Sequence, residues 1–225
     1  MAAHPKFSAV LFDCDGVLVD SESITNGVLH AMLVELGWQL TAEECIARFV
    51  GKMLRDEADI IEEHTGFRID DEWMTEFRRR RNAGLEASLQ AIPGVVETVH
   101  RLAESYPNRI ACASGADRPK IELQLRKVGL FDAFGGRIFS GMEQPNSKPS
   151  PDVYLAAAES LGIDPAEAAV IEDSPTGVMA GVAAGSRVLG FCPDSPVHHS
   201  VDTLLAVGAA ETFATMGDLP GLLLE

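Results

Sequence analysis

Two aspartates one residue apart, Asp13 and Asp15, follow directly after the hydrophobic run Phe7–Phe12. A charge beside a buried segment costs stability unless a partner compensates it. Carboxylates in this position can be compensated by a bound metal ion, and one of them can be left to react. A lone motif of this kind also arises where Asp begins a turn, so it needs support from the rest of the chain.

Residues of related chemistry end or follow three other apolar runs. Ser114 ends one run, the loop after another carries Lys148, and a third ends in Glu172-Asp173. Taken singly, each has an ordinary explanation: a turn or helix cap, a loop lysine, and the approach to a helix capped by Ser174. Their joint occurrence, in order and each after an apolar run, favours a functional site.

These runs are the predicted strands of a parallel sheet. Strand-like segments occupy 7–12, 109–114, 137–141, 168–173 and 187–191, and helical stretches separate most of them. Strands that are apolar throughout and alternate with helices indicate an α/β fold whose parallel sheet is covered on both faces. Ligands of such sheets bind beyond the carboxyl ends of the strands, which is where the chemically active residues fall.

The block 22–91 breaks this alternation, because it is helical and rich in charge and contains no convincing strand. One of its helices is predicted to begin at a capping box, with Thr41 as N-cap and Glu44 three residues later. We therefore predict a core of residues 1–21 and 92–225, and a helical domain of residues 22–91 inserted after the first strand.

The carboxylates predict a metal cofactor. Two unit charges about 4 Å apart repel by about 4 kcal/mol at an effective dielectric of about 20, so three carboxylates in one pocket call for a cation. Ligands that are all oxygen, with neither His nor Cys among them, point to a hard metal. We expect Mg²⁺, which accepts a few carboxylates completed by waters and substrate phosphate.

The composition argues against several classes of partner. Lys and Arg total 18 against 34 Asp and Glu, and the net charge of -16 disfavours nucleic acid and anionic membrane surfaces. No apolar run approaches the roughly 20 residues of a membrane span, and the N-terminal residues lack a signal-peptide pattern. The four cysteines have neither CxxC nor zinc-site spacing. We expect a cytoplasmic protein with reduced thiols.

The four segments resemble the motifs of the haloacid dehalogenase superfamily of phosphotransferases. DCDGVLVDSE is similar to its DxDGxLxDS signature, CASG to its second motif, SKPSPDVY to its Lys-Pro segment, and IEDSPTGVMAGVAAG to its acidic fourth motif. The resemblance implies a Rossmann-like three-layer core with an inserted four-helix cap, in a protein that is often monomeric. The insert looks like that of the β-phosphoglucomutase-like branch, and the segment VLGFCPDSPVHH resembles more loosely its sugar-phosphate phosphatases.

The resemblance also implies roles for the acidic residues. Asp13 would be the nucleophile that forms an aspartyl-phosphate, and Asp15 would protonate the leaving alkoxide and then activate water. Asp173 would bind Mg²⁺ together with Asp13 and the main-chain carbonyl of Asp15. Glu172 would support the metal directly or through water. A dehalogenase is disfavoured, because it needs neither a metal nor a second acid at the position of Asp15.

Substrate contacts are implied in both domains. Ser114 and Lys148 would hold the phosphoryl oxygens of a small phosphorylated metabolite. In the insert, residues 51–55 align with a substrate-facing segment of the family, so Lys52 and Arg55 could bind a carboxylate, hydroxyl or second phosphate. A solvated helix face explains these two residues equally well.

We therefore predict an Mg²⁺-dependent phosphomonoester hydrolase acting on a small sugar phosphate or sugar-acid phosphate. A phosphomutase could share every core residue, but β-phosphoglucomutases resembling this chain carry a His where Thr25 stands and a Ser-Lys pair where Ala116-Asp117 stands. The lack of these groups favours transfer to water. A catalytically idle binding domain on the same fold is a remote alternative, because every expected catalytic position is filled.

Overall fold

The computed structural model describes residues 4–49, 54–195 and 198–225. The chain divides into two compact units: a core unit, Met1–Asp20 with Gln90–Glu225, and a helical unit, Ser21–Leu89. Within the described ranges, no helix is both long and apolar enough to cross a membrane.

The core unit is built on a six-stranded sheet in the order β5-β4-β1-β6-β7-β8. Its strands are β1 (Ala9–Phe12), β4 (Ile110–Ser114), β5 (Ile138–Ser140), β6 (Ala168–Glu172), β7 (Arg187–Phe191) and β8 (Glu211–Phe213). Each strand runs parallel to its neighbours, and Val10 of β1 lies opposite Ile110 on one side and Ala169 on the other. The predicted α/β fold with a parallel sheet is therefore confirmed.

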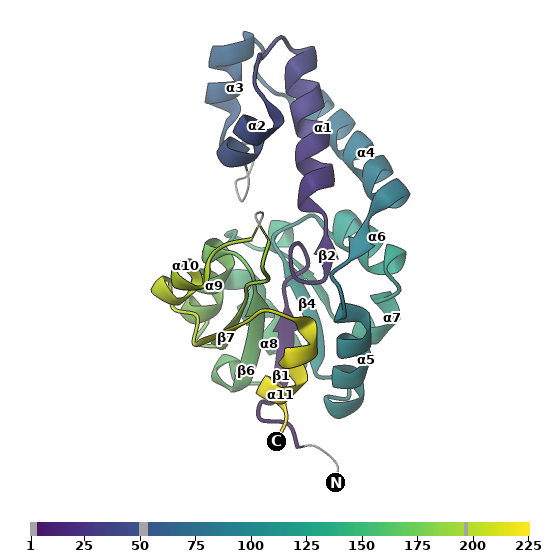
Figure 1. Cartoon of the computed structure of the whole chain (residues 1–225), viewed down its shortest axis with the longest axis vertical. Helices are drawn as coiled ribbons and strands as arrows, with labels where there is room; N and C mark the ends of the chain where they lie inside the picture. Colours follow the sequence, from purple (N-terminus) through teal and green to yellow (C-terminus); the bar gives the residue numbers. More distant parts are fainter. Residues whose placement is uncertain (1–3, 50–53, 196–197) are drawn as a thin grey trace. The chain divides into compact units, whose positions relative to one another are not determined.

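Helices cover both faces of this sheet (Figure 1). They are α5 (Val95–Ser105), α6 (Arg118–Lys127), α7 (Phe131–Phe134), α8 (Asp152–Leu161), α9 (Pro175–Ala183), α10 (Val201–Ala206) and α11 (Leu219–Leu223), with short 3-10 turns η1 (Gly141–Glu143), η2 (Pro165–Glu167) and η3 (Met216–Asp218). Successive strand residues face opposite ways. Leu11 lies in a buried cluster with Tyr154 and Val178, whereas Phe12 meets Phe134 edge to face at 6.1 Å. Burial on both faces explains why β1 is apolar throughout.

The order of the strands places β1 at the centre. After β1 the chain adds β4 and β5 on one side, then β6, β7 and β8 on the other. The carboxyl end of β1 is therefore flanked by those of β4 and β6, at the point where such sheets bind ligands. β8 was not predicted, because only Phe213 of its three residues is buried and no apolar run marks it. A short antiparallel pair, β2 (Val19–Asp20) with β3 (Gln90–Ala91), completes the core unit.

The described part of the helical unit holds α1 (Glu22–Glu35), α2 (Ala42–Phe49), α3 (Ala58–Thr65) and α4 (Asp71–Ser88). Its own apolar cluster includes Leu33, Trp38 and Ile61. The predicted capping box starts α2: Glu44 accepts from the Thr41 backbone N–H at 2.7 Å, and the Thr41 hydroxyl accepts from the Glu44 N–H at 3.1 Å. The role of this unit as a substrate-selecting cap remains a prediction.

Candidate active site

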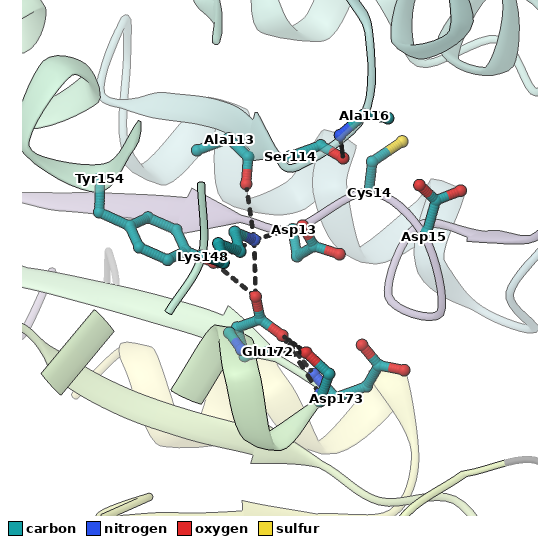
Figure 2. Close-up of polar contacts among 12 residues, drawn as sticks. Asp13, Cys14, Asp15, Ala113, Ser114, Ala116, Lys148, Tyr154, Glu172 and Asp173 are labelled. Atoms are coloured by element: carbon teal, nitrogen blue, oxygen red, sulfur yellow. Dashed lines mark hydrogen bonds and ion pairs between the residues drawn. The ribbon is translucent and has the colours of Figure 1, made fainter. Parts of the chain in front are cut away.

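Four of the predicted site residues lie at one edge of the core sheet. Asp13 follows the last residue of β1, Ser114 ends β4, Glu172 ends β6, and Asp173 comes directly after it. Because β1 pairs with β4 on one side and β6 on the other, these residues meet although up to 160 positions separate them in the chain. Figure 2 shows the side chains of this group around Asp13.

Lys148 connects the carboxylates of two strands. Its ammonium donates to Asp13 Oδ1 at 2.6 Å and to Glu172 Oε1 at 2.7 Å, and it also lies 2.9 Å from the Tyr154 hydroxyl and 3.2 Å from the Ala113 carbonyl oxygen. The Lys148 side chain is only 11% exposed. Such buried charges are stabilised only when they are paired and hydrogen-bonded, which this arrangement provides.

Glu172 is fully buried and serves as the centre of a hydrogen-bond network. Besides Lys148, it accepts from the Tyr154 hydroxyl at 2.8 Å, from the backbone N–H groups of Asp173 and Ser174 at 3.1 and 3.2 Å, and from the Ser174 hydroxyl at 3.1 Å. Ser174 also caps α9 by accepting from the Gly177 N–H, as the sequence predicts. The start of α9 therefore fixes the orientation of the Glu172 carboxylate.

The electrostatic environment of Asp13 calls for a cation. Burial raises the pKa of Asp13 to about 7; Lys148 opposes this rise, and Glu172 and Asp15 add to it. Burial alone would lower the pKa of Lys148, but Asp13 and Glu172 hold it well above its usual range, so Lys148 stays charged. Because the pKa of Asp13 stays raised in spite of Lys148, one ammonium does not fully compensate the burial of this carboxylate.

The acidic residues at this edge have the chemistry of a hard-metal site. Oxygens of Asp13, Glu172 and Asp173 lie within 4.8 Å of one another. These three carboxylates and the Lys148 ammonium together carry a net charge of about -2, which a divalent cation would balance. Gly16 leaves room for Asp173, because a Cβ on Gly16 would lie 2.0 Å from Asp173 Oδ2. The residues present therefore fit a magnesium ion.

Asp15 lies apart from the Asp13–Lys148–Glu172 cluster (Figure 2), and its carboxylate is paired with a different lysine, Lys120. Lys120 Nζ donates to both carboxylate oxygens of Asp15 at 2.8 Å, and Gln124 Nε2 donates to Asp15 Oδ1 at 2.7 Å. The two acidic groups with different predicted roles are thus held by different ammonium groups.

Ser114 is buried at the end of β4, and its hydroxyl accepts from the Ala116 N–H at 3.2 Å. Arg55 belongs to the helical unit, where it forms an exposed ion pair with Asp71. Lys52 lies outside the described residues. The structure therefore brings the core residues together and leaves the roles of Lys52 and Arg55 as predictions.

Three residues of this region were not predicted from the sequence: Tyr154, Lys120 and Gln124. Each lies inside a helix rather than at a strand end. Lys120 and Gln124 are four residues apart, a spacing that places two side chains on the same helix face. That spacing was available in the sequence, but it does not tell which face of α6 turns toward Asp15.

Comparisons with known proteins agree with this arrangement. Residues 7–185 match the family described as haloacid dehalogenase-like hydrolase. The chain is 29% identical over 221 residues to the 6-phosphogluconate phosphatase of Escherichia coli strain K12, covering 96% of this chain and 95% of the relative. It is 31% identical over 215 residues to hexitol phosphatase A of the same organism, covering 87% and 88%.

A solved structure extends the likeness to three dimensions. A HAD family hydrolase of Deinococcus radiodurans R1, with bound phosphate and sodium, matches with a TM-score of 0.77 and 33% identity, covering 97% of this chain and 96% of that one. The family match spans most of the chain, including all four motifs at the sheet edge. The protein therefore belongs to the haloacid dehalogenase-like hydrolases.

Proposed function

We propose that the protein is an Mg²⁺-dependent phosphatase that hydrolyses a small sugar phosphate or sugar-acid phosphate through an aspartyl-phosphate on Asp13. The observation that carries this proposal is the convergence of Asp13, Lys148, Glu172 and Asp173 at the carboxyl edge of the sheet. The names of the relatives, 6-phosphogluconate phosphatase and hexitol phosphatase A, favour a sugar-derived substrate.

Asp13 and Asp173, with the main-chain carbonyl of Asp15, are the residues that would hold the metal. Glu172 already accepts hydrogen bonds from Lys148, Tyr154 and the start of α9, so we assign it to orienting the site rather than to direct binding. A bound Mg²⁺ supplies positive charge that keeps Asp13 ionised and neutralises the phosphoryl oxygens.

The chain's own residues then divide the reaction into two displacements. In the first, an Asp13 oxygen bonds to phosphorus as the phosphorus–alkoxide bond breaks, and Asp15 gives its proton to the departing oxygen. In the second, Asp15 takes a proton from water, whose oxygen bonds to phosphorus and releases Asp13 with inorganic phosphate. Ser114 and Lys148 would hold the phosphoryl oxygens during both displacements.

Transfer to a second hydroxyl of the sugar, as in a phosphomutase, is the competing function. Asp117 stands where a β-phosphoglucomutase-like chain has the lysine of its Ser-Lys pair, and here it caps α6 by accepting from the Lys120 N–H at 3.1 Å. An aspartate engaged in this way repels a second phosphate rather than binding it. The substitution at Asp117 therefore favours water as the acceptor.

The proposal is tested by measuring phosphate release from a panel of sugar and sugar-acid phosphates, with Mg²⁺ and with chelator, while isomerised product is counted in the same samples. Chelator-sensitive release of inorganic phosphate is the expected result. The Asp13→Asn variant, purified in parallel, controls for contaminating phosphatases. Isomer formation without free phosphate would identify a mutase, and release that survives the chelator would contradict the metal assignment.

A further inference from the structure

We propose that Lys120 and Gln124 are positioning residues that hold Asp15 in the orientation needed for proton transfer. This inference rests on the proposed function, in which Asp15 is the acid and base. It adds two residues from α6 to a site whose sequence motifs lie at strand ends and in the loop that carries Lys148.

The contacts form a clamp around one carboxylate. Lys120 reaches both oxygens of Asp15 at 2.8 Å, and Gln124 reaches Oδ1 at 2.7 Å. A bidentate contact fixes the plane of a carboxylate as well as its position, since rotation about the terminal bond would break one of the two contacts. The third contact, from a second side chain, fixes which oxygen faces α6.

Both clamp residues are themselves held in place. Gln124 is fully buried, and its side-chain oxygen accepts from the Cys14 thiol at 3.5 Å, so its NH₂ group is the end that faces Asp15. Lys120 is 8% exposed, and its backbone N–H binds the N-cap Asp117. A lysine buried to this extent has few alternative positions, so the clamp is pre-organised rather than formed by chance on a surface.

The start of α6 links the clamp to the phosphate-binding edge. β4 ends at Ser114, and α6 begins after Asp117, so the same short connection sets the position of Ser114 and of the helix that carries Lys120 and Gln124. The two residues lie on one face of α6 because they are four positions apart. The helix geometry of α6 thus places the Lys120 ammonium and the Gln124 amide where both can donate to Asp15.

The clamp suits a group that alternates between two protonation states. An ammonium and an amide N–H can donate to a carboxylate and equally to the carbonyl oxygen of a neutral carboxyl group. The two contacts to Oδ1 can therefore persist while Oδ2 gives its proton to the leaving alkoxide and later takes one from water. Lys148 donates hydrogen bonds to Asp13 and Glu172 and is therefore not part of this clamp.

The test uses the dependence of the reaction on the leaving group. A sugar alkoxide needs a proton as it departs, whereas 4-nitrophenolate departs without one, so a misplaced acid harms only the first substrate. The parameter kcat/KM reports steps up to departure of the leaving group and leaves out hydrolysis of the aspartyl-phosphate. A residue with only a structural role would affect both substrates alike.

The variants are Lys120→Met and Gln124→Met, which keep length and remove the donors. Each variant should lower kcat/KM about 10- to 100-fold for the best sugar phosphate of the panel. The kcat/KM for 4-nitrophenyl phosphate should stay within about twofold of the wild-type value. Lys127→Met, the same substitution at an exposed position of α6, should change neither value. Having two independent clamp variants keeps the test open if one of them does not fold.

Asp15→Asn separates the clamp from the function on which it rests. If Asp15→Asn selectively harms the sugar phosphate and the clamp variants do not, the clamp inference is wrong and the acid role of Asp15 stands. If Asp15→Asn shows no preference between the two substrates, the acid role and the clamp both fail. Equal losses on both substrates in the clamp variants would also overturn the inference.

Discussion

A methyl group added to Gly177 would test whether the buried Glu172 network holds the site together. Gly177 lies in the first turn of α9, and a Cβ at this position would fall 1.7 Å from Glu172 Oε1 and 2.2 Å from Oε2. No such contact is possible, so Gly177→Ala must displace either the carboxylate or the start of the helix. The carboxylate is fully buried and cannot turn toward solvent in place.

The expected cost follows from the hydrogen bonds that Glu172 would lose. Displacement would break the bonds from Lys148 at 2.7 Å and from Tyr154 at 2.8 Å. At about 1.5–3 kcal/mol for each bond to a charged group, the loss is about 3–6 kcal/mol. The better helix propensity of Ala returns about 1 kcal/mol, which leaves a net destabilisation of about 2–5 kcal/mol.

Thermal unfolding followed by circular dichroism measures this cost. A loss of that size lowers Tm by about 4–20 °C in a chain of this length. Gly221→Ala is the matched control, because a Cβ on this exposed glycine of α11 meets no heavy atom within 4 Å, and its Tm should hold or rise slightly. If Gly177→Ala stays within about 2 °C of wild type, the described packing of Glu172 against α9 is wrong.

Four further predictions concern the site residues. Asp13→Asn should abolish turnover and keep the wild-type circular dichroism spectrum; near-normal activity would refute its role as nucleophile. In chelator-treated protein, Asp13 has a raised pKa of about 7 in the folded state. The folded state is therefore favoured while this carboxyl group is protonated, and that stability is lost as the pH rises through about 7. Asp13→Asn removes the titrating group, so it should raise Tm more at about pH 8 than at about pH 5. Added Mg²⁺ should remove that difference, and a pH-independent effect would argue against the shift. Tyr154→Phe keeps the ring but removes the hydroxyl between Lys148 and Glu172, and should cost about 1–3 kcal/mol in urea unfolding and lower kcat; an unchanged midpoint would show that the hydroxyl does not support the network. Arg55→Ala should raise KM for the sugar phosphate more than for 4-nitrophenyl phosphate, and equal effects would remove Arg55 from substrate recognition.

The residues that could be predicted from the sequence are those set by strand ends. Asp13, Ser114 and Glu172 each close an apolar run, and a parallel sheet brings such ends to one edge whatever the details of packing. The capping box at Thr41 and Glu44 and the cap at Ser174 are equally local signals, since each depends on a few neighbouring residues.

The residues that could not be predicted depend on tertiary packing. Tyr154 reaches Glu172 only because α8 lies on the face of the sheet that carries Leu11. Lys120 reaches Asp15 only because one particular face of α6 turns toward the site. Helical periodicity tells which residues share a face, but the neighbour of that face is decided by the packing of the whole core. β8 was also not predicted, because an edge strand of three residues with one buried residue shows no clear hydrophobic periodicity.

The central claim is that phosphate passes through Asp13 to water. The most direct test is a rapid-quench experiment. Wild-type protein with Mg²⁺ is mixed with the best sugar phosphate of the panel, labelled with ³²P. The amount of label on protein, on inorganic phosphate and on sugar is then followed over time. We predict that label appears transiently on the peptide that contains Asp13, is released by hydroxylamine, and passes into inorganic phosphate. Inorganic phosphate formed without label on that peptide, or label that passes into an isomeric sugar phosphate, would contradict the account.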